Sequence, residues 1–222
     1  MKMPLLYTVY RTLRRGWKRL TPEAQQALRT YVASQKTANG YMNAAGREDA
    51  YYAQFGRVLQ AVVSPVRLLC LDIHLDVQES RGRNTVYARF FDFLEKERWL
   101  RRPKETGTSL PDVLTTNAVC CLLAMQHQTG QPLDMNQVEW LRQRQDASGG
   151  FYASEQAPIP DLLSTAVALF TLSLTGKPAH DATSFIQAHW REGGGFTPSL
   201  LDDYSDVEYV FYGLLGLGTL KR

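Results

Sequence analysis

Apolar and polar residues divide the C-terminal half of the chain into two kinds of helix that alternate. Residues 133–144 and 181–190 carry apolar side chains on one face only, which predicts amphipathic helices. Residues 162–174 are apolar on every side, which is typical of a helix buried all round. Each amphipathic helix is therefore expected to form a hairpin with the buried helix that follows it, the amphipathic helix outside and the buried helix inside.

These hairpins repeat at a constant step, and the clearest copies are residues 130–176 and 177–220. A Gly-Gly-aromatic turn follows each outer helix, where glycine permits a positive φ. Three pairs of matching residues are each 45 positions apart: Trp140 and Phe185, Gly150 and Gly195, Asp161 and Asp206. A fixed period of this size indicates a repeat architecture, in which each unit buries its apolar face on its neighbours.

Two weaker copies extend the pattern toward the N-terminus. Residues 31–52 keep the order of helix, Gly40-Tyr41 turn and Asp49, and a further inner helix is expected after Asp112, without the turn. Residues 66–79 and 84–100 read as two more helices. The whole chain, 1–222, is thus predicted to be a single all-α domain with almost no strand.

The best-preserved unit has an aromatic-Leu start, a glutamine and a Gly-x-aromatic turn, carried by Trp140, Leu141, Gln145, Gly149 and Phe151. This order resembles the prenyltransferase and squalene-cyclase repeat. The closing run 206–217 looks like the terminal inner helix of protein prenyltransferase β-subunits. The resemblance implies an α/α-toroid-like array of hairpins whose inner helices line an apolar cavity for an isoprenoid. With four or five hairpins, the ring is expected to be small or incomplete.

The resemblance also shows where this chain departs from the family. Protein prenyltransferases hold zinc through an Asp-x-Cys and a histidine at the starts of inner helices. Asp161 occupies the aspartate position, but Leu163 and Tyr209 stand at the other two. A single carboxylate cannot hold zinc, which needs three or four donors. We therefore expect no metal and no cofactor. The acidic Asp-x-Asp-Asp motif of the cyclases does not occur either.

Acidic and aromatic residues of the inner helices are the candidate site. Aspartates at the helix starts are explained by N-capping, or they form a polar rim around a substrate head group. The catalytic candidates are Asp161, Asp206, Glu208 and Tyr209. The substrate-binding candidates are Asp49, Tyr52, Asp112, Phe170, Phe211 and Tyr212. The aromatic residues are either ordinary core or the lining of a cavity for an isoprenoid or a carbocation. Buried Glu208 needs a basic partner or a raised pKa.

Charge and cysteine content bear on location. Residues 1–20 carry six basic residues and no acid, alternating with apolar ones. This segment is either a terminal helix packed on the repeats or a basic amphipathic helix on an anionic membrane surface. Cys70, Cys120 and Cys121 lie in apolar helical surroundings, which favours buried thiols in a reducing, cytoplasmic compartment. No motif indicates nucleic acid.

Two classes of function follow. The first is a prenyltransferase- or terpene-cyclase-like protein that binds an isoprenoid or similar apolar ligand in a central helical cavity. The second is a non-catalytic helical-repeat scaffold. An unclosed ring leaves the C-terminal hairpin with apolar surface around Phe211, Leu214 and Leu217. A homodimer or a complex with a second protein subunit is expected there.

Overall fold

The chain folds into helices joined by short turns, as the hydrophobic pattern predicts. The computed structural model describes residues 3–38, 40–64, 90, 93–94 and 113–220. Its eight described helices are α1 (Leu5–Trp17), α2 (Pro22–Ser34), α3 (Ala50–Val63), α5 (Thr116–Thr129), α6 (Met135–Arg142), α7 (Leu162–Leu174), α8 (Thr183–Ala188) and α9 (Val207–Thr219). Two antiparallel pairs of two-residue strands complete it: β1 (Tyr41–Met42) with β2 (Glu48–Asp49), and β3 (Phe151–Tyr152) with β4 (Pro160–Asp161). The all-α class is thus confirmed.

Parts of the prediction fall outside the described residues. These are the helix expected over 66–79, nearly all of the helix expected over 84–100, and residues Cys70 and Asp112.

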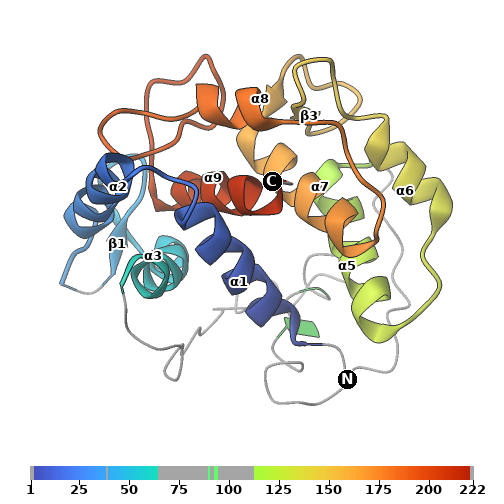
Figure 1. Cartoon of the computed structure of the whole chain (residues 1–222), viewed down its shortest axis with the longest axis horizontal. Coiled ribbons are helices and arrows are strands. Elements are labelled where there is room, and N and C mark those ends of the chain that lie inside the picture. Colours follow the sequence, from blue (N-terminus) through green and yellow to red (C-terminus); the bar gives the residue numbers. More distant parts are fainter. Residues whose placement is uncertain (1–2, 39, 65–89, 91–92, 95–112, 221–222) are drawn as a thin grey trace.

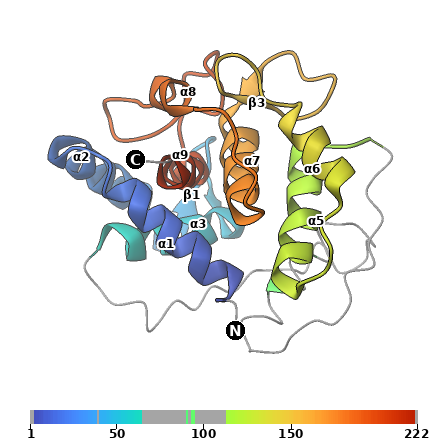
Figure 2. The same ribbon diagram turned by 45° about the vertical axis from the view of Figure 1, so that its right-hand side comes forward.

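The inner helices form the core, and the outer helices lie against them (Figures 1 and 2). Helix α9 packs against α7 on one side and against α3 on the other, and α7 packs against α5. Helices α2, α6 and α8 contact α3, α5 and α9. The inner helices therefore follow one another in space as α5, α7, α9 and α3.

The turn after an outer helix has the same form in three places, including the weak first copy of the predicted repeat. Isolated bridges close these turns at Lys36–Tyr41, Gln145–Phe151 and Trp190–Phe196. In the first and the last of them, the aromatic ring lies on a glycine of the following inner helix. A Cβ added to Gly56 would come within 2.3 Å of the Tyr41 ring, and one on Gly213 within 2.5 Å of Phe196.

The two later turns also contact the next outer helix or the residues just before it, and the last of these contacts links the last hairpin to the first. Gly149 has φ of 92°, and a Cβ there would lie 2.4 Å from the Asp181 carbonyl oxygen, just before α8. Gly194 has φ of 99°, and its Cβ would lie 2.3 Å from the Ala27 carbonyl oxygen in α2. The first hairpin thus lies against the C-terminal one, on a flank we expected to be free. Association as a homodimer or with a second subunit stays a prediction, and it would need a surface other than this flank of the C-terminal hairpin.

The N-terminal helix α1 packs its apolar face on the repeats. Leu5, Leu13 and Trp17 are buried, and α1 crosses α9 so closely that a Cβ on Gly218 would overlap the Thr12 carbonyl oxygen. Membrane contact through residues 1–20 stays a prediction, and the apolar face of α1 is already packed against the repeats. Among the described residues, no helix is long and apolar enough to cross a bilayer.

Basic side chains near α1 satisfy the carbonyl groups at the ends of other helices. Arg14 donates to the Val62 carbonyl, and Arg29 Nε donates to the Val63 carbonyl at 3.3 Å. Both acceptors lie at the C-terminal end of α3, where positive charge is favourable. Part of the basic charge of this region therefore has a structural role.

Buried thiols occur where the sequence predicts them. Cys120 and Cys121 of α5 are free and buried. Burial raises the pKa of Cys120 to about 12, against a smaller opposing effect of a hydrogen bond with Thr171. A thiol with such a pKa is unreactive near neutral pH. The cytoplasmic location inferred from these cysteines stays a prediction.

Candidate functional site

The aspartates that begin the inner helices act as N-caps. The side chains of Asp49, Asp161 and Asp206 accept hydrogen bonds from the backbone N–H groups of Tyr51 (2.9 Å), Ser164 (2.8 Å) and Tyr209 (3.0 Å). Such caps satisfy amide groups that the helix itself leaves unpaired. The capping interpretation is confirmed for these three residues, and a role in ligand binding needs separate support.

The fourth inner helix begins later than predicted. Thr115 caps α5 by accepting from the Ala118 N–H at 3.2 Å, so the helix starts at Thr116 rather than directly after Asp112. Asp112 itself lies outside the described residues, so its part in substrate binding stays a prediction.

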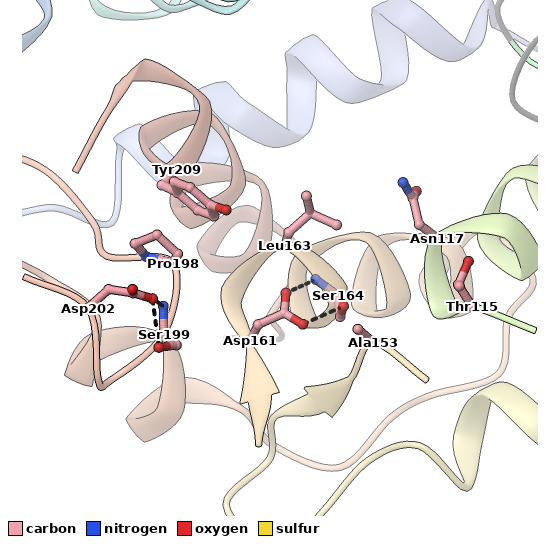
Figure 3. A pocket seen from close by; sticks show the side chains of 10 residues that line it. All are labelled: Thr115, Asn117, Ala153, Asp161, Leu163, Ser164, Pro198, Ser199, Asp202 and Tyr209. Atoms are coloured by element: carbon pink, nitrogen blue, oxygen red, sulfur yellow. Dashed lines mark hydrogen bonds between the residues drawn. The ribbon is translucent and has the colours of Figure 1, made fainter. Parts of the chain in front are cut away.

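A pocket of about 330 Å³ lies where the N-terminal ends of α5, α7 and α9 meet (Figure 3). Asn117 from α5, Asp161 and Leu163 at the start of α7, and Tyr209 from α9 line it, together with the loop after Phe196. The three positions that the resemblance assigns to zinc ligands, Asp161, Leu163 and Tyr209, are thus brought to one hollow. Sequence reasoning missed Asn117, although it lies one residue into an inner helix, as Leu163 and Glu208 do.

The carboxylates in this pocket are already engaged by neighbouring groups. Asp161 accepts from the Ser164 backbone and, at 2.7 Å, from its hydroxyl. Asp202 Oδ2 accepts from both the N–H and the hydroxyl of Ser199, at 3.0 and 2.7 Å (Figure 3). Burial raises the pKa of Asp161, and the bonds from Ser164 oppose this. No group of three or more His, Cys, Asp or Glu side chains in the described part of the chain is placed to hold a metal ion.

A second group of side chains lies beside the pocket, where the N-terminal halves of α3 and α9 meet. Tyr209 belongs both to the pocket and to this second group. Rings from the two helices pack edge to face, with centroids 5.2 Å apart for Tyr51–Phe55 and for Phe55–Phe211. We call this group the acid–aromatic cluster; it consists of Tyr51, Tyr52, Phe55, Asp206, Glu208, Tyr209, Phe211 and Tyr212.

Glu208 is the most unusual residue of the acid–aromatic cluster. Its side chain is on α9, only 8 % of the residue is exposed, and Oε1 accepts a hydrogen bond from the Tyr51 hydroxyl at 3.0 Å. Burial raises the Glu208 pKa to about 7; the hydroxyls of Tyr51 and Tyr52 lower it, and the nearby Asp206 adds to the rise. Of the two alternatives for this carboxylate, a basic partner or a raised pKa, the described residues favour the second.

Asp206 differs from Asp161, the equivalent cap of α7, because only one of its two buried carboxylate oxygens accepts a hydrogen bond of ordinary geometry from a described residue. Oδ1 caps α9, whereas Oδ2 is buried and has no hydrogen bond of ordinary geometry in the described part of the chain. The Tyr52 hydroxyl comes close enough to lower the Asp206 pKa, against the larger raising effect of burial. No lysine, arginine or histidine among the described residues contributes to the pKa shift of Asp206 or Glu208.

Most of the predicted site residues therefore come together, and one does not. Tyr52, Phe211 and Tyr212 join the acid–aromatic cluster, with Asp49 capping α3 at its edge. Phe170 is instead buried on α7, 7 % exposed, and belongs to the core.

One buried polar residue was not singled out from the sequence. His189 is fully buried in the turn after α8, with Nδ1 2.9 Å from the Thr197 carbonyl oxygen and Nε2 unpaired in the described structure. Burial lowers its pKa, so the ring is neutral near pH 7. We assign it a structural role within the turn.

Comparison with known proteins gives no family assignment. No protein-family model matches the chain, and no curated protein matches it significantly. The resemblance to the prenyltransferase and squalene-cyclase repeat therefore rests on the repeat residues.

Proposed function

We propose that this chain is an α/α-toroid-like protein that binds an apolar, isoprenoid-like ligand between its inner helices. The head of the ligand lies at the acid–aromatic cluster. The observation that carries the proposal is the meeting of Asp161, Leu163 and Tyr209 around one pocket, directly beside the cluster. The resemblance predicts that these three positions face a shared substrate site, although their side chains here cannot bind zinc.

The arrangement of the hairpins supports a ring, closed or incomplete. The inner helices follow one another from α5 through α7 and α9 to α3. The turn after α8 contacts α2 in the way that the turn after α6 contacts the start of α8. Hairpins placed around a common axis have such contacts at every step.

The electrostatics of the described residues disfavour a diphosphate at the acid–aromatic cluster. Binding a diphosphate calls for arginine or lysine, whereas Glu208 and Asp206 lie here without a described basic partner. A carboxyl group with a pKa of about 7 is also too weak an acid to protonate an alkene readily. It is better suited to accepting a proton or a hydrogen bond near neutral pH. If the protein is an enzyme, we assign Glu208 the role of proton acceptor, with Tyr51 and Tyr209 positioning it or the ligand.

The second function, a non-catalytic repeat scaffold, is favoured by one set of observations. Ser164 binds both carboxylate oxygens of Asp161, Ser199 binds Oδ2 of Asp202, and Phe170 fills the core rather than facing a cavity. A scaffold needs no open inner face, so the two functions differ in whether an apolar ligand binds there.

Ligand binding by the purified protein tests the proposal. Farnesol, a neutral isoprenoid, is expected to bind with a dissociation constant in the micromolar range. Phe55→Ala, which removes the ring at the centre of the aromatic contacts, is expected to weaken binding about tenfold. Tyr7→Ala, which removes an exposed ring on α1, is the matched control and should bind as the wild type does. A folded wild-type protein that binds no farnesol would favour the scaffold.

A further inference from the structure

We infer that the acid–aromatic cluster recognises an organic cation, an alkylammonium group at the head of the bound ligand. For the apolar remainder of that ligand the inference rests on the proposed function. The head group itself is recognised by side chains of α3 and α9 alone and is tested separately below.

The first support is the arrangement of the rings. Phe55 contacts Tyr51 and Phe211 edge to face, and the remaining ring pairs of the acid–aromatic cluster are tilted or edge to face as well. None of these described pairs is a parallel stack; in each edge-to-face pair one ring presents its edge, so the faces of that ring are not covered by its partner. The face of an aromatic ring carries the negative part of its quadrupole and attracts a cation within about 6 Å.

The second support is uncompensated negative charge. Glu208 and Asp206 are 8 % and 1 % exposed and have no described lysine, arginine or histidine acting on them. Asp206 Oδ2 is buried without a hydrogen bond of ordinary geometry. Leaving such an acceptor unpaired costs free energy, which a bound cation would recover.

The third support is that the alternatives fit less well. Hard metal ions need several oxygen or nitrogen ligands, and the described residues offer no group of three suitable acidic, histidine or cysteine side chains. An anion would be repelled by both carboxylates. A weakly hydrated organic cation matches a site that combines carboxylates with rings. The cluster reaches the surface at Tyr51, which is 47 % exposed and hydrogen-bonded to Glu208.

Cation binding should depend on pH through the ionisation of Glu208. The titratable groups that face Glu208 are tyrosines of α3, of α9 and of the loop before α9: Tyr51, Tyr52, Tyr204, Tyr209 and Tyr212. Beside these tyrosines lie the carboxyl groups at the helix starts, Asp49, Asp161 and Asp206, and the Cys121 thiol of α5. Burial raises the pKa of the tyrosines in the cluster, which therefore stay uncharged. Glu208 changes charge near pH 7, so affinity for a cation should rise as pH increases from 6 to 8.

Two isosteric probes isolate the charge. Choline and 3,3-dimethylbutan-1-ol have the same shape, but one carries a quaternary nitrogen where the other has carbon. Calorimetric titration of the full chain at pH 8 is expected to show choline binding about tenfold more tightly than the alcohol. Glu208→Gln should reduce this preference without abolishing it, because the rings and Asp206 remain. Tyr51→Phe should reduce it and keep the fold. Glu139→Gln on the exposed face of α6 is the matched control and should retain it.

Each outcome decides one claim. Equal binding of the two probes by the folded wild type, or a preference that is unchanged in Glu208→Gln, overturns the cation site. Farnesol binding without a preference for choline leaves the proposed function standing and removes only this inference. A preference for choline without farnesol binding supports the cation site and removes the isoprenoid part of the proposed function.

Discussion

Two helix caps built on the same plan differ in how much of the aspartate they use. Asp161 and Asp206 begin inner helices α7 and α9 at equivalent positions of the repeat, and each binds the amide of the residue three positions on. Ser164 adds its hydroxyl to Asp161, so both carboxylate oxygens are engaged. The Tyr209 side chain adds no bond to Asp206, and Oδ2 has no hydrogen bond of ordinary geometry among the described residues.

The difference arises from the second and third residues after each cap. In α7 these are Leu163, which is apolar, and Ser164, which binds the cap itself. In α9 they are Glu208, whose carboxylate is hydrogen-bonded to Tyr51 of α3, and Tyr209, whose phenol lines the pocket. One cap therefore stabilises a helix and nothing more. The other leaves negative charge among aromatic rings, which is a feature of sites rather than of cores.

The largest effect is expected for Glu208→Gln, whose gain in free energy of unfolding over the wild type should depend on pH. A carboxyl group whose pKa rises from 4.5 to about 7 on folding binds its proton more tightly in the folded state. Wild-type stability should therefore fall as pH rises between these values, and the variant should escape this loss. We expect a gain of about 1–3 kcal/mol at pH 8 and almost none at pH 4. Urea denaturation at both pH values measures it; an equal gain at both would contradict the raised pKa.

Asp161→Ala should cost the next largest amount. It removes the cap of α7 and leaves the Ser164 N–H and hydroxyl without their partner, a loss of about 1–2 kcal/mol at pH 7. Ligand affinity should stay within about twofold of the wild type if Asp161 is only a cap. A tenfold loss of affinity in a folded variant would instead return Asp161 to the catalytic candidates.

Tyr51→Phe should have a smaller effect on stability than on binding. The change removes one hydrogen bond to Glu208 and keeps the ring in contact with Phe55, so the free energy of unfolding should fall by about 0.5–1.5 kcal/mol. The Glu208 pKa should rise further, because the Tyr51 hydroxyl lowers it. An unchanged pH dependence of stability would show that the two residues are not coupled.

Asp206→Asn should have the smallest effect. Asparagine caps a helix about as well as aspartate, and the substitution removes a buried charge that has no basic partner among the described residues. Thermal unfolding should therefore change by no more than the equivalent of about 0.5 kcal/mol. A large loss would mean that the free oxygen of Asp206 has a partner that stabilises the fold.

The repeat made much of this arrangement predictable, because it is local. The period placed Asp161 and Asp206 at helix starts, where their residue type is explained by capping, and the structure agrees. The start of α5 was misplaced because both Asp112 and Thr115 are good N-caps and the pattern cannot choose between them. The bond between Tyr51 and Glu208 joins residues 157 positions apart. It depends on α3 packing against α9, which a period between neighbouring units does not specify.

The most direct test follows the side-chain carboxyl carbons of Glu208 and Asp161 by NMR across pH, with and without choline. We predict that Glu208 titrates near pH 7 in the free protein, and that choline shifts its resonance and lowers its pKa while leaving Asp161 unchanged. The contrary result is a Glu208 that titrates near its ordinary value of 4.5, or a ligand that moves Asp161 and not Glu208. Either would show that the ligand site is not at the α9 cap.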